Sequence, residues 1–331
     1  MSTADFRIVT DEEVDLRLDR WFKRYFPEIG HSHLQKLLRT GQIRVDSKRV
    51  RANKRLAAGQ KVRIPPSAEP PEKWAERNQE VCSDDADFIR SLVIYRDDWV
   101  VAINKPPGLA VQGGSGTSRH VDAMLGALRD LGRERLRLVH RLDKDTSGVL
   151  LLANNAASAT RLGAAFSGRA AAKLYWAVTV GVPSPIEGQI DLSLSKEQGR
   201  GGERVVAESP HGKRATTRYR VIETVGEKLA LVALMPSTGR THQLRVHMAA
   251  IRTPVLGDGK YGGKGSFIDE LEMANRLHLH ARRIAVRHPS GKGILDIFAD
   301  LPEHMAITFK NVGLDTTPED DPFGDFSSIE G

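Results

Sequence analysis

The sequence predicts an α+β fold, with a main body built on a mixed, largely antiparallel sheet and a small, mainly helical domain in front of it. Two observations lead to this prediction. In residues 88–312, apolar runs typical of strands outnumber helical patterns, without the regular βαβ alternation of a doubly wound sheet. In residues 14–66 helical periodicity dominates, and a Pro-rich stretch follows. At 331 residues the chain is long enough for both parts to bury a core.

Residues 14–66 begin with apolar side chains at helical spacing. The apolar positions i, i+3, i+4 and i+7 are Leu18, Trp21, Phe22 and Tyr25. This helix should end near Pro27, and a second should run from an N-cap at Ser32 to Gly41. Residues 42–50, QIRVDSKRV, alternate like a hairpin around an Asp-Ser turn. One face of that hairpin would be basic.

Positive charge is concentrated in the same segment. Between Val14 and Ile64, fourteen basic residues stand against four acidic ones, a net +10 that exceeds the +7 of the whole chain. Such a concentration predicts a polyanionic partner. The strings RLDRWFKRYFP, SHLQKLLRTGQIRVDSKRV and AAGQKVRIP resemble an S4 domain, a small RNA-binding module of αL type. The resemblance implies RNA contacts from Arg17, Lys36, Arg39, Arg44, Lys48 and Arg49.

Three further segments are expected to lack a core of their own. They are a flexible N-terminus over residues 1–13, a Pro-rich and then acidic linker over residues 67–87, and an acidic, disordered tail over residues 313–331. No apolar run approaches the roughly 18 residues that cross a membrane, and there is no signal pattern, so we expect a cytoplasmic protein without a membrane partner. A single cysteine, Cys82, excludes an intramolecular disulfide.

The main body reads as strands with interspersed helices. Residues 92–108, LVIYRDDWVVAINKPPG, predict two strands across an Asp-Asp turn. Residues 149–153, VLLLA, predict a buried strand, residues 156–166 a helix, and residues 173–181, KLYWAVTVG, another strand. These elements define the mixed sheet.

The densest cluster of chemically capable side chains is HRLDKDTSG, residues 140–148, between two strand-like runs. A protein kinase catalytic loop also carries His, Arg and Asp, but here Leu142 interrupts the order and Gly148 stands where that loop has Asn. GDGKYGGKG is not a P-loop, because Asp258 replaces its first Gly and Gly265 its Ser or Thr. A phosphoryl-transfer site is therefore disfavoured.

Two short histidine clusters raise the alternative of a metal site. Their members are His242, His247, His278 and His280. The first pair lacks the i, i+4 spacing of a zincin helix, and alternation places the second pair on one strand face. Hydrogen bonds within the fold or contacts with phosphate are the expected roles, and no metal is predicted.

Several motifs, in order, resemble the ribosomal large-subunit pseudouridine synthase family, in its C-like subgroup. They are INKPPGLAVQGGSG (103–116), VHRLDKDTSGVLLLA (139–153), KLYWAVTVG (173–181), STGRTHQLRVHMAAIRTPVLGDGKYGG (237–263) and LHLHARRI (277–284). The resemblance implies an enzyme that turns uridine in RNA out of its stack and isomerises it to pseudouridine. This rearrangement needs no redox change and no external energy, so no cofactor is expected.

Carried onto this sequence, the motifs imply a catalytic set. Asp143 is the catalytic carboxylate, acting as a nucleophile or a base, and Arg245 supplies a neighbouring positive charge that favours its ionised form. Tyr175 offers a face for stacking on uracil and a hydroxyl for late proton removal. Arg141 fills the space vacated by the flipped nucleotide, and Leu279 contacts the other side of the base.

The remaining expectations concern supporting residues and partners. His242 and Gln243 are expected to bind substrate, while Asp145 stabilises its loop and Lys105 positions a loop or a phosphate. The expected substrate is 23S ribosomal RNA, bound by a monomer. Transfer RNA remains an alternative substrate, and a catalytically idle RNA-binding assembly factor remains an alternative function.

Overall fold

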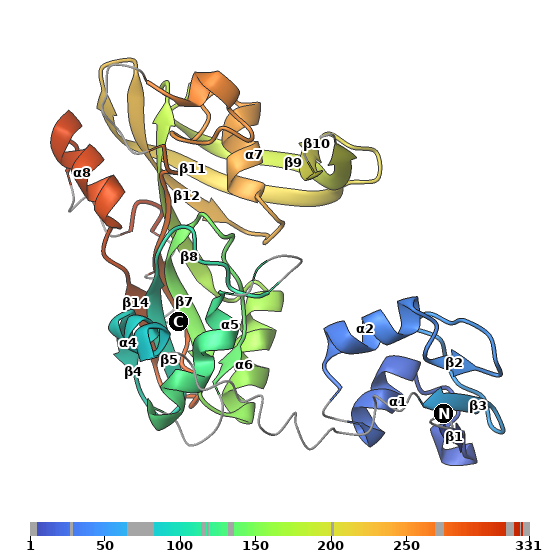
Figure 1. Cartoon of the computed structure of the whole chain (residues 1–331). Helices are drawn as coiled ribbons and strands as arrows, with labels where there is room; N and C mark the ends of the chain where they lie inside the picture. Colours follow the sequence, from blue (N-terminus) through green and yellow to red (C-terminus); the bar gives the residue numbers. More distant parts are fainter. Residues whose placement is uncertain are drawn as a thin grey trace. The chain divides into compact units, whose positions relative to one another are not determined.

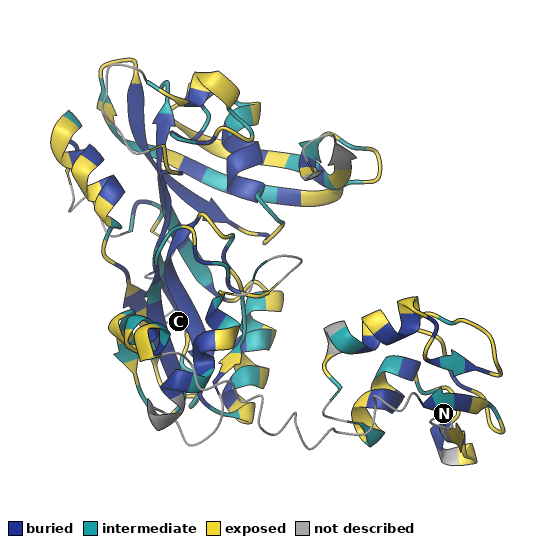
Figure 2. Ribbon diagram, in the orientation of Figure 1, coloured by how far each residue is buried: buried dark blue, intermediate teal, exposed yellow. Residues whose placement is uncertain are grey.

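The computed structural model describes residues 5–26, 29–64, 83–113, 117, 119–131, 136–199, 202–268, 275–315, 321–324 and 326. The chain divides into two compact units, Met1–Glu80 and Val81–Gly331 (Figure 1). Each unit buries a hydrophobic core of its own (Figure 2). No helix of the described residues is long and apolar enough to span a membrane.

The N-terminal unit combines short helices with a small antiparallel sheet. Its elements are β1 (Asp5–Ile8), η1 (Asp11–Glu13), α1 (Leu18–Tyr25), α2 (His31–Arg39), β2 (Arg44–Val45) and β3 (Lys61–Ile64). The strands pair in the order β1-β3-β2. The amphipathic first helix is confirmed as α1, which buries Leu18, Trp21 and Phe22 in the core.

Two expectations for this unit are wrong. The helix α2 begins at His31 with Gly30 as its N-cap, so Ser32 lies inside the helix and does not cap it. Residues 5–8 do not form a flexible N-terminus, because β1 pairs along β3 and the next residue, Val9, is buried in the core.

The expected hairpin over residues 42–50 is only partly present. Asp46 and Ser47 both have positive φ, as a tight turn requires. The partner of β2 is β3, however, and the returning segment contributes a single bridge between Val45 and Lys48. The side chain of Asp46 accepts the backbone N–H of Lys61 at 2.8 Å, which holds the turn against β3.

The C-terminal unit contains many strands and fewer helices. The strands are β4 (Val93–Arg96), β5 (Val100–Lys105), β6 (Arg137–Leu138), β7 (Ser147–Ala153), β8 (Ala172–Val180), β9 (Glu187–Gly199), β10 (Gly202–Ala207), β11 (Lys213–Val225), β12 (Leu229–Pro236), β13 (Leu279–Arg287) and β14 (Ile294–Phe298). The helices are α4 (Ser83–Ser91), α5 (Val121–Met124), η3 (Leu125–Leu131), α6 (Ala156–Ser167), α7 (Gln243–Ala250), η4 (Gly263–Ser266) and α8 (Glu303–Val312).

These strands form one sheet of order β10-β9-β11-β12-β8-β13-β7-β5-β4, with β14 paired to β13 and β6 to β7. The pairings of the described strands are antiparallel except between β13 and β7, which are parallel. The predicted α+β fold with a mixed, largely antiparallel sheet is confirmed. The strands predicted around the Asp-Asp turn and at residues 149–153 and 173–181 are present, and so is the helix at residues 156–166.

Burial follows from the apolar runs of the sequence. β7 and β12 are buried along their whole length, as the dark blue strands of Figure 2 show. The helix α6 packs on β7, and α7 packs on β9, β10 and β11 (Figure 1). Continuous apolar strands covered on both faces form the rigid frame from which the functional loops extend.

Gly148 lies where β7 meets β13, opposite Ala281. Its φ is +111°, and a Cβ at this position would lie 2.2 Å from the carbonyl oxygen of Ala281. Gly148→Ala should therefore push the two strands apart and destabilise the unit by about 3 kcal/mol or more. Urea unfolding measures this loss. Gly163→Ala in α6, where a Cβ meets nothing within 4 Å, is the control and should not destabilise.

The linker was expected over residues 67–87, and its C-terminal boundary is wrong. Residues 65–82, with Cys82, lie outside the described residues, but α4 begins at Ser83. Ala86 and Ile89 of this helix are buried in the core beneath it. The acidic run at the end of the expected linker is therefore the first turn of a helix.

The expected disordered tail is also wrong for part of residues 313–331. Leu314 and Phe326 are buried, and the guanidinium of Arg283 lies 4.1 Å from the ring centroid of Phe326. The backbone carbonyl of Pro322 accepts a hydrogen bond from Arg220 at 2.7 Å. Aromatic side chains stacked on arginines hold these residues on the sheet, although the segment has few aliphatic residues. Residues 316–320, 325 and 327–331 lie outside the described part.

Candidate active site

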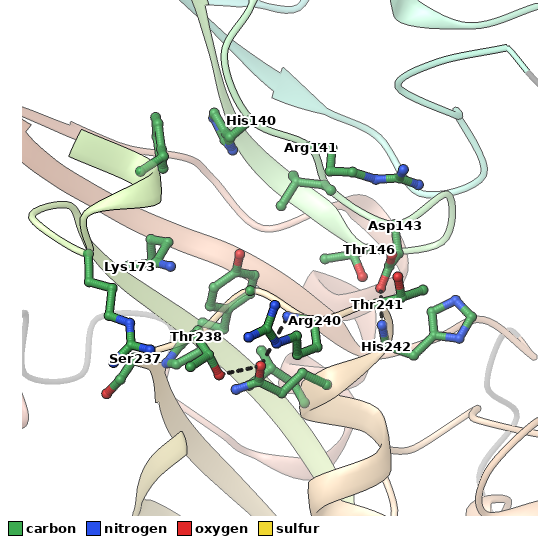
Figure 3. A pocket seen from close by; sticks show the side chains of 18 of the residues that line it. His140, Arg141, Asp143, Thr146, Lys173, Ser237, Thr238, Arg240, Thr241 and His242 are labelled. Carbon is green, nitrogen blue, oxygen red and sulfur yellow. Dashed lines mark hydrogen bonds between the residues drawn. The ribbon is translucent and has the colours of Figure 1, made fainter. Parts of the chain in front are cut away.

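A cavity of about 570 Å³ brings together segments that lie far apart in the sequence. It is lined by the loop before β7, the end of α6, β8, the loop after β12, the start of α7, and β13 (Figure 3). Asp143 is the only carboxylate in this lining among the described residues. The cations of the lining are Arg141, Arg169, Lys173, Arg240 and Arg245. The cavity thus combines one acid with a strongly positive wall.

The start of α7 holds Asp143 in place. The carboxylate oxygen Oδ2 accepts the backbone N–H of His242 at 3.2 Å (Figure 3). His242 is the N-cap of α7 and has a φ of +53°, a left-handed conformation that costs free energy in a residue with a side chain. Its Nδ1 lies 2.6 Å from the hydroxyl of Tyr261, a contact that fixes the ring. His242 therefore serves the site through its backbone, next to the acid.

The loop that carries Asp143 is anchored from β5. Lys105 is fully buried, and its Nζ donates to three backbone carbonyls, one of them that of Lys144 at 3.0 Å. Burial lowers the pKa of Lys105 to about 7, although the charges of Asp145 and Asp143 act to raise it. Lys105 positions the loop, as its place in the NKPPG motif led us to expect.

His140 anchors the other end of this loop. Its Nε2 accepts the backbone N–H of Leu151 in β7 at 2.8 Å, and its ring stacks on Phe166 at a centroid distance of 4.2 Å. Burial lowers the pKa of His140 to about 3, so the ring is neutral at physiological pH. Arg141, the next residue, is exposed at the cavity, beside Asp143 (Figure 3).

The direct partner of Arg245 is Asp258, a residue that the sequence did not single out for this role. Nε and Nη2 of the guanidinium donate to the two oxygens of Asp258 at 2.8 and 2.7 Å, and both side chains are buried. Burial acts to lower the pKa of Arg245, but Asp258 outweighs it and the pKa is raised. The charge of Asp143 adds a smaller effect of the same sign. A buried arginine requires a carboxylate partner, and that rule could have pointed to Asp258.

Tyr175 and Leu279 line the cavity from the neighbouring strands β8 and β13. Burial and the nearby charge of Asp143 raise the pKa of Tyr175 above its ordinary value. The hydroxyl therefore stays protonated, and proton removal by a phenolate is disfavoured. Leu279 is buried and belongs to the same apolar cluster as Tyr175, so it serves the core and the cavity together.

Gln243, expected to bind substrate, lines the cavity, and its amide makes hydrogen bonds within the protein. Its Oε1 accepts from the hydroxyl of Thr238 at 2.7 Å and from the backbone N–H of Arg240 at 3.1 Å. Its Nε2 donates to the carbonyl of Thr216 and the hydroxyl of Thr217. With both ends engaged and the side chain buried, Gln243 fixes the start of α7 to β11 and to the loop after β12.

The other three histidines of the two clusters, His247, His278 and His280, are buried within the fold. His278 contacts the hydroxyl of Thr308 at 2.8 Å, and His280 contacts the hydroxyl of Ser147 at 2.9 Å. His247 is fully buried, and neither ring nitrogen has a hydrogen-bond partner in the described structure. Among the described residues, no three His, Cys, Asp or Glu side chains are grouped to hold a metal ion.

These buried histidines should make the C-terminal unit sensitive to acid. Burial lowers the pKa of His247, His278 and His280 to about 4, below the ordinary value of about 6.5. The unfolded chain therefore binds more protons between these values, so stability is full above about pH 6.5 and falls towards pH 4. Each histidine contributes a loss of up to about 3 kcal/mol. Urea unfolding at pH 7, 6, 5 and 4 measures it.

His247 offers the cleanest variant for this prediction. Because its ring makes no hydrogen bond in the described structure, His247→Phe should flatten the acid loss without weakening the protein at pH 7. His278→Phe breaks hydrogen bonds and should weaken it already at pH 7. An unchanged acid profile in His247→Phe would show that this ring does not contribute.

A second cavity, of about 530 Å³, lies on the N-terminal unit. Of the expected RNA-contacting residues, it brings together Arg17 and Arg39, and Arg51 joins them in its lining. Arg44 donates to two backbone carbonyls within its own loop and has a structural role as well. The other expected contacts, Lys36, Lys48 and Arg49, are exposed but lie outside this cavity.

A cavity with one carboxylate among five cations suits an anionic substrate. Residues 99–250 match the RNA pseudouridylate synthase family. Ribosomal large subunit pseudouridine synthase C of Rickettsia felis is 34% identical over 302 residues, covering 89% of this chain and 96% of its own length. The Escherichia coli K12 protein of the same name is 36% identical, with 90% and 93% covered.

A solved structure agrees with these sequence matches. The human RNA pseudouridylate synthase domain containing 4 is 29% identical with a TM-score of 0.58, covering 71% of this chain and 99% of its own. The chain belongs to the RNA pseudouridylate synthase family, whose members isomerise uridine to pseudouridine in RNA.

Proposed function

We propose that this chain converts specific uridines of 23S ribosomal RNA into pseudouridine, with Asp143 as the catalytic carboxylate. One observation above the others supports Asp143 as the catalytic residue. Asp143 is the only carboxylate that lines the cavity among the described residues. The choice of RNA rests on relatives that are named ribosomal large subunit synthases and match most of the chain. The protein acts in the cytoplasm as a monomer.

The proposed chemistry uses only groups of the chain. The bond between the ribose and N1 of uracil breaks, the base turns, and a new bond to the ribose forms at C5. C5 then loses its proton, and N1 takes up a proton. Asp143 acts on the flipped nucleotide while Tyr175 and Leu279 bracket the base. Arg141, exposed beside the acid, fills the gap that the base leaves in the RNA. Atoms and electrons balance within the substrate, so no cofactor is needed.

A comparison of modified nucleotides tests the proposal. Pseudouridines are mapped in the ribosomal and transfer RNA of cells with the gene, without it, and with Asp143→Asn in its place. Certain pseudouridines of 23S RNA should disappear without the gene and stay absent with the variant. Loss confined to transfer RNA, or restoration by the Asn variant, would refute the proposed substrate or the proposed catalytic residue, respectively.

We assign most of the RNA affinity to an S4-type domain over residues 14–66 and catalysis of the isomerisation to the C-terminal unit. The +10 charge of the N-terminal segment and its arginine-lined cavity support this assignment. The residues of the catalytic cavity all come from the C-terminal unit. The two contributions should therefore be separable.

Deletion of residues 1–80 should leave a folded unit that still isomerises uridine. It retains α4 and every residue of the catalytic cavity. Its RNA affinity should fall at least about tenfold at low salt and depend less steeply on salt, because fewer counterions are displaced. Single-turnover rates against RNA concentration at two salt levels measure both effects. An unchanged affinity with a lost saturated rate would instead make the N-terminal unit part of the active site.

A further inference from the structure

Of the five cations that line the cavity, only Arg245 has a carboxylate partner within the described part of the chain, and two of the other four lie close together. Lys173 stands on β8, and Arg169 follows the C-terminal end of α6. Both line the cavity, and neither pairs with a carboxylate there. The charge that acts on Lys173 is that of Arg169, which together with burial lowers the pKa of Lys173. The free protein therefore holds two like charges together at the cavity wall.

Among the described residues, Lys173 lacks the hydrogen-bond acceptors that surround the ammonium group of Lys105. Lys105 is buried, but its ammonium group donates hydrogen bonds to three backbone carbonyls. Lys173 has no hydrogen-bond acceptor in the described structure, although it is only partly exposed. A largely buried ammonium without acceptors is unfavourable unless a ligand supplies them.

The backbone around Arg169 is also unusual. Arg169 has a φ of +65°, a left-handed conformation that is rare in residues with a side chain. Conformations of this kind persist where the surroundings enforce them and gather at functional sites. Here the turn sends the chain from α6 into β8 and leaves the arginine at the cavity wall, near Lys173.

Strand geometry relates this pair to the reacting base. Lys173 and Tyr175 are two residues apart on β8, and both line the cavity, so they share one face of the strand. Leu174 and Trp176, between and after them, are buried in the core on the opposite face. Two residues span about 6–7 Å along a strand, a distance that one nucleotide can bridge.

We propose that Lys173 and Arg169 form a phosphate subsite, which binds the backbone phosphate of the flipped nucleotide while its uracil lies at Tyr175. This inference rests on the proposed function for the identity of the base as uracil. The binding of a phosphate by Lys173 and Arg169 does not depend on the proposed function. The subsite orients the nucleotide and touches no reacting atom. Its chemistry is that of a phosphate monoester or diester, whether in RNA or in a free nucleotide.

Binding of uridine and of uridine 5′-monophosphate to the full-length protein tests the subsite by calorimetry, independently of turnover. The wild type should bind the monophosphate at least about tenfold more tightly than uridine, as charge-assisted hydrogen bonds imply. Lys173→Gln and Arg169→Gln should each lose most of this preference while keeping the affinity for uridine. Lys173→Arg should keep much of it. Lys292→Gln, the same change at an exposed turn, should behave as wild type.

A second arm uses short RNAs centred on a uridine identified by the mapping. A neutral methylphosphonate in place of a phosphate that flanks this uridine should raise the KM of the wild type with little change in kcat. Lys173→Gln should raise the KM for the unmodified RNA and respond little to the methylphosphonate. If the wild type does not prefer the monophosphate, or Lys173→Gln retains the preference, the subsite is refuted. A Lys173-dependent preference in a protein that modifies no ribosomal RNA would uphold the subsite and refute the substrate.

Discussion

Asp143→Asn should reduce isomerisation by at least about a thousandfold, or about 4 kcal/mol of transition-state free energy, while the fold and RNA affinity persist. The amide keeps the size of the side chain and can still accept the N–H of His242, but it lacks the negative charge that the reaction needs. Tritium release from RNA labelled at C5 of uridine measures the rate. Filter binding and thermal unfolding measure affinity and fold.

Asp145→Asn is the matched control for this variant. The two carboxylates lie in the same loop, but Asp145 is exposed and does not line the cavity. The rate of this variant should stay within about threefold of wild type, since the side chain of Asp145 is exposed and water screens its charge. If Asp143→Asn kept activity within tenfold of wild type, Asp143 would not be the catalytic residue.

Asp258→Asn should lower the free energy of unfolding by about 3–5 kcal/mol, because it leaves the guanidinium of Arg245 buried without a counter-charge. The amide oxygen can still accept the backbone N–H groups of Lys260 and Tyr261, so the variant isolates the lost charge. Urea unfolding measures the loss. Isomerisation should also fall, because Arg245 and the start of α7 lie in the cavity wall.

The double variant Arg245→Met with Asp258→Asn separates the loss of stability from the loss of activity. Removal of both charges should restore much of the stability, since a buried ion pair adds little over neutral groups of similar size. Activity should not return, because the cavity has lost Arg245. Equal stabilities of wild type and Asp258→Asn would mean that solvent already satisfies this guanidinium.

Sequence patterns predicted the parts of the fold that follow from local regularity. Apolar spacing located α1 and β7, and the Asp-Asp turn located β4 and β5, because each depends on neighbouring residues. Ordered motifs located Asp143, Tyr175 and Arg141 within one cavity. The S4 resemblance rests on the same kind of local pattern.

Contacts between distant segments could not be predicted in this way. Gln243 was expected to face substrate, but threonines of β11 and of the loop after β12 occupy its amide, and only the tertiary fold brings them there. The tertiary fold also brings about the pairing of Arg245 with Asp258. It likewise places Phe326 of the tail against Arg283. Acidic composition predicted disorder in the tail, where Phe323 and Phe326 instead pack against Arg218 and Arg283.

The parallel register between β7 and β13 has a consequence for synthesis of the chain. It joins Ser147 to His280 across more than a hundred residues, so the start of β7 stays unpaired on that side until β13 leaves the ribosome, although β6 already pairs with the end of β7. Contacts of such high sequence separation form slowly, whereas the N-terminal unit, in which Asp5 pairs with Ile64, lies within a shorter segment that leaves the ribosome first. A nascent chain stalled before β13 would therefore present a complete N-terminal unit and a C-terminal unit that still lacks its parallel strand pairing.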